Sequence, residues 1–102
     1  MPDIEAIMQV VFGAIDEVNL AQPADAQLQR APDEIILGHK AKLDSMGMAT
    51  LLASVEERVH EAFGARIDFF TEATMDESGN VLKNVVALSA FVADRLAEAE
   101  GG

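Results

Sequence analysis

The chain has 102 residues, half of which are hydrophobic, and 18 acidic against 7 basic side chains give a formal net charge of −11. This length suits one compact domain with a single core and is too short for two. The absence of cysteine from the sequence excludes disulfides and thiolate zinc sites. The acidic balance argues against nucleic acid as a partner, because phosphate backbones select Lys and Arg, and favours basic protein surfaces.

The N-terminal segment has the pattern of an amphipathic helix over residues 3–18. Its apolar residues recur every three or four positions, as one face of a helix requires, and Asp3 is available as the N-cap. Asp16 and Glu17 interrupt the apolar pattern before it is long enough to cross a bilayer, and no positive flank precedes it. We therefore expect no membrane insertion and a soluble, cytoplasmic protein.

Residues 19–43 form a long predicted connection. Pro23, Pro32 and Gly38 interrupt this segment, and no helical period is sustained in it, although residues 25–30 are compatible with a helical turn. A connection of this length is unusual in so small a domain and is often functional.

Two further helices are predicted, over about 45–63 and 84–99. Gly64 is a natural end for the first of them, and the segment 64–83 has room for a short extra helix around 75–82. The apolar stripe of the 45–63 helix consists of Met48, Leu51, Leu52, Val55, Val59 and Phe63, while Thr50, Ser54, Glu57 and Glu61 occupy its other faces. The stripe of the 84–99 helix consists of Val85, Leu88, Val92 and Leu96, widened by Phe91.

These elements predict an all-α fold, because no segment of the sequence shows the alternation of a strand. Each amphipathic helix has to cover its apolar face against another element. We expect a small antiparallel helical bundle of three main helices plus a short extra helix, with a long loop between helices one and two. The bundle is predicted to form a single domain over residues 1–102.

Candidate catalytic residues do not assemble into a site. Ser45 and His60 lie fifteen positions apart on one predicted helix, so a rise of about 1.5 Å per residue separates them by roughly 22 Å. His39 is near Ser45 in sequence, but it has no identifiable orienting acid. We predict no catalytic residue.

Asp76, Ser78 and Asn80 match the first three ligand positions of a calcium-binding loop. Val81 stands where such a loop needs glycine, and Ala87 stands where it needs the bidentate Glu. We predict no metal site in this segment or elsewhere.

Residues 43–47 read LDSMG and stand where the 45–63 helix begins. Asp44 or Ser45 is suited to cap that helix, because both side chains accept hydrogen bonds from free backbone N–H groups. In an acidic, cysteine-free helical chain, this motif resembles the acyl carrier protein family, including its peptidyl and D-alanyl carriers. LDSMG followed by two leucines is similar to the D-alanyl version, and SVEERVHEAFG, at residues 54–64, is similar to the acidic second helix of acyl carriers.

The resemblance implies an attachment site. Ser45 would accept a 4'-phosphopantetheine arm as a covalent cofactor, its hydroxyl attacking the pyrophosphate of coenzyme A with the help of a Mg-dependent phosphopantetheinyl transferase. Asp44 would help to organise metal and phosphate during the transfer. The thiol of the arm would then hold cargo as a thioester, so the resemblance implies an acyl carrier protein that is not an enzyme itself.

The resemblance also implies transient partners, namely the transferase, an acyl- or aminoacyl-loading ligase, and acyltransferase or synthase enzymes. The candidate docking residues, outside the apolar stripe, are Met46, Thr50, Ala53, Glu56 and Glu57. An apolar side chain beside acids suits brief docking on basic enzyme surfaces, because charge raises the on-rate without demanding tight binding. Alternatively, Glu56 and Glu57 form an ordinary solvated helix face. The chain is expected to be a monomer.

Several residues depart from the usual fatty-acid carrier. Thr50, Arg58 and His60 make the 45–63 helix less uniformly acidic. Lys40 and Lys42 precede the attachment site, where they either contact the phosphate of the arm or a dedicated partner, or are solvated loop charges. These features indicate a specialised carrier in fatty acid, lipid or secondary-metabolite biosynthesis, with a fatty acyl chain, a polyketide intermediate or an amino acid as cargo.

Two other functions remain open at this point. The chain is alternatively an acidic helical protein-interaction module in which Ser45 is only a helix cap. A hydrolase that uses Ser45 is a third interpretation, for which the sequence offers no base.

Overall fold

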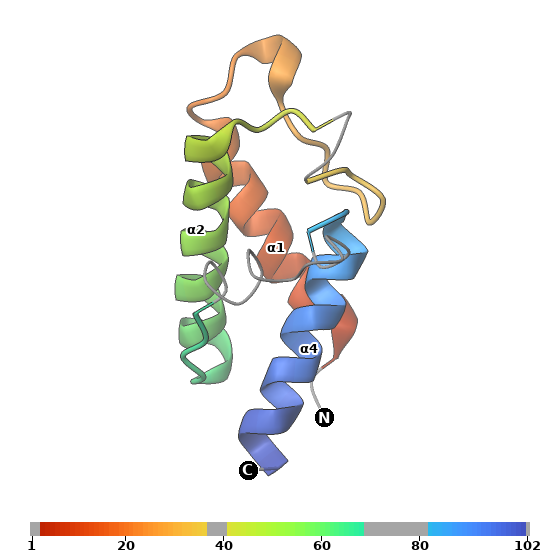
Figure 1. The fold of residues 1–102 in the computed structure, drawn as a ribbon, viewed down its shortest axis with the longest axis vertical. Helices are drawn as coiled ribbons and strands as arrows, with labels where there is room; N and C mark the ends of the chain where they lie inside the picture. The colour runs from red at the N-terminus through yellow and green to blue at the C-terminus, as the bar shows by residue number, and fades with distance from the viewer. Residues whose placement is uncertain (1–2, 37–40, 69–81, 102) are drawn as a thin grey trace.

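Three α-helices make up most of the chain in the computed structural model, which describes residues 3–36, 41–68 and 82–101 (Figure 1). They are α1 (Ile4–Asn19), α2 (Ser45–Phe63) and α4 (Val85–Gly101), and a short 3-10 helix, η1 (Ala24–Ala26), follows α1. The described residues contain no strand, only an isolated bridge between Ile35 and Asn84. The all-α class predicted from the sequence is therefore confirmed for this part of the chain.

The helices begin where local capping satisfies free backbone N–H groups. Asp3 is the N-cap of α1, and its Oδ1 accepts a hydrogen bond from the backbone N–H of Glu5 at 3.0 Å. At the start of α4 the side chain of Asn84 plays the same part, accepting from the N–H of Ala87 at 2.9 Å. The first and third predicted helices are thus observed within one or two residues of their expected ends.

Gly64 ends α2, as the sequence predicts. Its φ of 73° lies in the left-handed region, which glycine adopts without strain, and its N–H donates to the carbonyl of His60 at 2.9 Å. The helical turn expected within residues 25–30 is η1, slightly earlier in the chain. The short helix expected around 75–82 lies almost entirely outside the described residues.

The core forms where α1 packs against α2 and α4. Figure 1 shows α1 running antiparallel to α2 and to α4, and it packs against each of them. Its Ile7, Val11 and Ile15 are fully buried. Most of the two predicted stripes is buried, and Phe63 and Phe91 are half-buried against the core. The buried members are Met48, Leu51, Leu52, Val55 and Val59 of α2 and Val85, Leu88, Val92 and Leu96 of α4. Ser54, expected on another face of its helix, is also buried.

The connection from α1 to α2 is anchored to the start of α4. It rises past the upper ends of α1 and α2 to η1 and returns beside α4 (Figure 1). There Val85 donates its N–H to the Glu34 carbonyl at 3.1 Å, and Ile36 donates to the Lys83 carbonyl at 3.2 Å. The side chains of Leu28 and Ile36 are buried in the core. The connection is therefore part of the packed structure over its described length.

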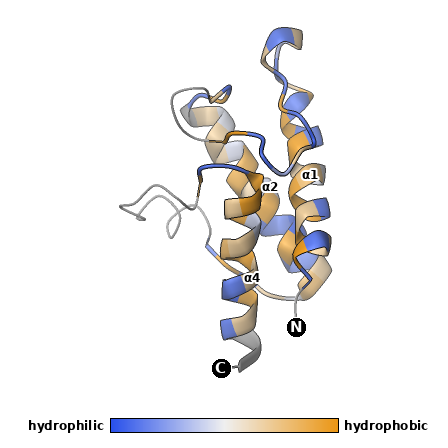
Figure 2. Ribbon diagram, turned by 90° about the vertical axis from the view of Figure 1, so that its right-hand side faces the viewer, coloured by the Kyte–Doolittle hydropathy of each residue, from blue (hydrophilic) through white to orange (hydrophobic). Residues whose placement is uncertain are grey.

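Hydropathy divides the bundle into an apolar interior and polar edges. In Figure 2 hydrophobic residues gather where the helices meet, and the connection between α1 and α2 is mostly hydrophilic. The Cα radius of gyration is 12.7 Å, close to the value of about 13 Å for a compact chain of 100 residues. None of the described helices combines the length and the apolar character needed to cross a membrane.

Removing the side chain of Leu52 tests the assignment of the core. Leu52→Ala is expected to lower the free energy of unfolding by about 2 to 5 kcal/mol, because it deletes apolar contacts and leaves a cavity. Leu20→Ala is the matched control, since Leu20 is 88% exposed, and it should change stability by less than about 0.5 kcal/mol. Urea unfolding of the two variants measures both values. Equal effects would contradict the packing described here.

Candidate functional site

Asp44, rather than Ser45, caps the helix that carries the candidate site. The Oδ1 atom of Asp44 accepts a hydrogen bond from the N–H of Gly47 at 2.8 Å, and its carbonyl accepts from the N–H of Met48 at 2.9 Å. Ser45 is the first helical residue of α2. The sequence allowed either side chain to be the cap, and the structure assigns the capping role to Asp44.

Gly47, the glycine of the motif, leaves room for Leu43 and Asp44 to approach the first turn of α2 closely. A Cβ atom on Gly47 would lie 3.0 Å from Cδ2 of Leu43 and 3.3 Å from Oδ1 of Asp44. Any larger residue would press on the carboxylate that closes the first turn. The Asp-Ser-Met-Gly spacing thus has a local structural reason, because the acid and the glycine together build the start of α2 and Ser45 lies between them.

Two of the predicted docking residues lie in the first two turns of α2. The Met46 side chain is 80% exposed, which is unusual for a large apolar side chain in a described helix. Thr50 is exposed as well, and its hydroxyl donates to the carbonyl of Met46 at 2.9 Å. The apolar end of Met46 is thus available to a partner.

The other predicted docking residues line an open hollow of about 460 Å³ on the solvent side of α2. Ala53 and Glu57 are exposed and Glu56 is half-buried. The complete lining is Ala53, Glu56, Glu57, His60, Glu61 and Arg66. The last three were not among the predicted docking residues. The helical spacing of His60 and Glu61 from Glu57 indicates a shared face, whereas Arg66 follows α2 and reaches the hollow only through the fold.

Arg58 faces α1 and is not a free charge of the docking surface. Its guanidinium contacts the Glu17 carboxylate at 3.1 Å and Oγ of Ser54 at 3.2 Å, and the Ser54 hydroxyl donates to Glu17 at 2.7 Å. Gly13 permits this approach, because a Cβ there would lie 2.9 Å from the guanidinium. The Ser54 hydrogen bond, then Arg58, lower the pKa of Glu17 below its ordinary value of 4.5.

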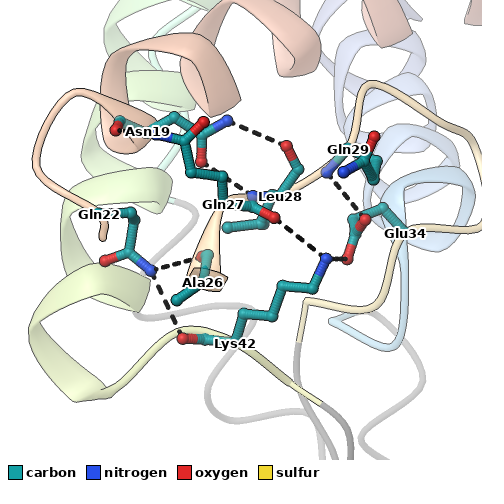
Figure 3. A network of polar contacts seen from close by, with 8 residues as sticks. All are labelled: Asn19, Gln22, Ala26, Gln27, Leu28, Gln29, Glu34 and Lys42. Atoms are coloured by element: carbon teal, nitrogen blue, oxygen red, sulfur yellow. Dashed lines mark hydrogen bonds and ion pairs between the residues drawn. The ribbon is translucent and has the colours of Figure 1, made fainter. Parts of the chain in front are cut away.

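Lys42 belongs to a polar network that joins the connection to the segment before α2 (Figure 3). Its ammonium donates to the carbonyl of Gln27 at 3.0 Å and lies 3.4 Å from Oε1 of Glu34. The amide of Gln22 approaches the Lys42 carbonyl at 3.5 Å. Asn19, the last residue of α1, bonds to both the N–H and the carbonyl of Leu28. Lys42 therefore has intramolecular partners, unlike a simple solvated loop charge.

Of the remaining candidates, only His60 lies within the described residues. It is exposed on the same helix as Ser45, fifteen positions further along the chain, whereas His39 and Lys40 lie outside the described residues. The calcium-like segment lies almost wholly outside them too. Within the described ranges no group of three or more His, Asp or Glu side chains is placed to hold a metal ion.

Comparison with known proteins adds no relative: no family model, curated protein or solved structure matches this chain.

The contact between Glu17 and the Ser54–Arg58 pair should make stability depend on pH. A carboxylate with a lowered pKa in the folded state stabilises the fold above its unfolded pKa, and this contribution is lost as pH falls through the folded pKa. Glu17→Gln should therefore lower the free energy of unfolding at neutral pH. The difference from the wild type should shrink as pH falls below 4.5.

Urea unfolding at a series of pH values measures this difference. Glu57→Gln is the control, since it removes the same charge from the exposed side of α2. A Glu17→Gln effect that stays constant down to acid pH, or that equals the Glu57→Gln effect, would count against the network.

Proposed function

We propose that this protein is a carrier that holds acyl or aminoacyl groups as thioesters on a 4'-phosphopantetheine arm attached to Ser45. The observation that carries the proposal is the assignment of the helix cap to Asp44, which leaves Ser45 as the first residue of α2. It supports the resemblance to acyl carrier proteins, because a serine at this position is not needed to close the helix. Met46, the next residue in the first turn of α2, exposes an apolar side chain beside the proposed attachment site.

The start of α2 is chemically suited to a phosphodiester. The first N–H groups of an α-helix have no intrahelical acceptor, and they carry the positive end of the helix dipole. Asp44 satisfies the N–H of Gly47, and the N–H groups of Ser45 and Met46 belong to the same first turn, where an anion is favoured. In the transfer, Ser45 Oγ gives its proton to a base of the transferase or to water and forms a bond to the phosphorus of coenzyme A that bears the pantetheine. The bond from that phosphorus to the bridging oxygen breaks, and adenosine 3',5'-bisphosphate leaves.

Asp44 has a second role in this proposal. Its Oδ1 is used by the cap, and among the described residues no protein partner is found for Oδ2 on this exposed side chain. A carboxylate oxygen beside the reacting serine is a suitable ligand for the Mg²⁺ that a transferase supplies. The arm, once attached, supplies the thiol that the chain lacks.

The acidic hollow on α2 supports docking to basic enzyme surfaces. Three acids line the hollow, Glu56, Glu57 and Glu61, against one arginine, Arg66. Arg58 of the same helix is engaged by Glu17 on α1. An excess of acids at a rim raises association rates and makes them sensitive to salt. We propose that ligases, acyltransferases or synthases of a biosynthetic pathway use this side of α2.

Intact-protein mass spectrometry tests the attachment site. After incubation with coenzyme A and a broad-specificity phosphopantetheinyl transferase, the wild type should gain one phosphopantetheine group and Ser45→Ala should gain none. Ser54 and Ser89 are buried, so Ser78→Ala is the informative control, and it should be modified like the wild type. No gain in the wild type, or a gain that persists in Ser45→Ala, would refute the proposal.

Substitutions at Asp44 separate capping from metal organisation. Asp44→Ala should lower the free energy of unfolding by about 1 kcal/mol, because it removes the cap. Asp44→Asn keeps an oxygen acceptor for the cap and should retain most of the stability, yet it should slow modification at least as strongly as Asp44→Ala. Urea unfolding and the initial rate of modification provide the two measurements. Wild-type rates for Asp44→Asn would limit Asp44 to its structural role.

A further inference from the structure

Two large apolar side chains are far more exposed than any others among the described residues. Leu20 is 88% exposed and Met46 is 80% exposed, whereas the next values are 41% for Val86 and 38% for Ile4. Single exposed apolar side chains are common on protein surfaces. Two with almost their whole surface in water become informative when they lie at the same end of a molecule.

Leu20 and Met46 do lie at the same end of the bundle. Leu20 directly follows α1 and Met46 is the second residue of α2, and Figure 1 shows that the end of α1 and the start of α2 are adjacent at the upper end of the antiparallel pair. The hydrogen bond from Gln22 to the Lys42 carbonyl joins the two segments. Leu20 and Met46 therefore belong to neighbouring segments at one end of the bundle.

The polar network keeps this arrangement in place. Lys42 is held by Gln27 and by Glu34, whose side chain is only 9% exposed (Figure 3). Glu34 is itself held, because its second carboxylate oxygen accepts from the N–H of Gln29 at 2.8 Å and its carbonyl accepts from Val85 of α4. Leu20 and Met46 are therefore next to backbone segments that hydrogen bonds already hold in place. Less conformational entropy is lost when a partner binds to such segments.

We propose that Leu20 and Met46 form one two-point docking surface at the end of the bundle that carries the attachment site, and that it binds an enzyme with an apolar socket and a basic rim. This inference rests on the proposed function and extends its docking surface from α2 to the end of α1. Leu20 is the new element, since it contributes nothing to the core and yet exposes a full apolar side chain.

Charge favours an enzyme partner over a second copy of this chain. Asp25 in η1 and Asp44 at the cap are exposed acids at the same end of the bundle. A surface of this composition, on a chain with a net charge of −11, repels its own copy and attracts a basic rim. The apolar pair then supplies the short-range contact that the charges alone do not.

Titration of the isotope-labelled chain with a broad-specificity phosphopantetheinyl transferase, without coenzyme A, tests the surface directly. Amide resonances of Leu20 and Met46 should shift or broaden, whereas that of Ile4 should not. Leu20→Ser and Met46→Ser should each raise Kd about tenfold, which corresponds to about 1.4 kcal/mol. Ile4→Ser is the matched control, because Ile4 is also exposed and lies about 24 Å along α1 from Leu20, and its Kd should stay unchanged.

The outcomes distinguish this inference from the proposed function. Modification of the wild type together with an unchanged Kd for Leu20→Ser overturns the surface and leaves the carrier proposal intact. Binding that depends on Leu20, without any mass gain when coenzyme A is added, supports the surface and refutes attachment. If the wild type does not bind the transferase, the docking surface is refuted. If the Leu20 amide resonance shifts when the chain alone is diluted, the surface binds a second copy of the chain, and the proposal of an enzyme partner is refuted.

Discussion

The structure depends on the burial of α1 against two helices at once. A helix that covers one neighbour needs a single apolar stripe, but α1 packs against both α2 and α4 and buries Ile7, Val11 and Ile15 completely. Because α1 packs against two helices, its polar residues are confined to its ends and to the one side that faces solvent. Glu17, near the end, meets Ser54 and Arg58 of α2, so the contact between the first two helices includes a polar bond as well as apolar packing.

The antiparallel arrangement of α1 and α2 determines where the candidate site lies. The end of α1 and the start of α2 meet at one end of the bundle, and the long connection between them has to leave and return there (Figure 1). Its return beside α4 explains why Glu34 is able to bond to Lys42 with its side chain and to Val85 with its backbone. The segment before Ser45 is thereby bonded to the connection, which is bonded in turn to α4, and Leu43 of this segment packs against the core.

The two sides of α2 serve different purposes. The inward side is apolar and has one polar contact, in which Ser54 is satisfied by Glu17 so that its burial is not costly. The outward side carries the hollow lined by Glu56, Glu57 and Glu61. Arg58 is paired with Glu17 of α1, so the hollow keeps three acids against Arg66 and the proposed docking surface has an excess of acids.

Local features of the sequence determined the helices and their ends, because periodicity, Asp3 at one cap and Gly64 at another act within a few residues along the chain. The sequence also indicated the LDSMG motif and most of the outward face of α2. Only the tertiary structure decided between Asp44 and a serine cap, paired Arg58 with α1, and brought Lys42 to its partners. These outcomes depend on contacts between segments distant in sequence or on the geometry of one turn, which residue spacing alone does not determine.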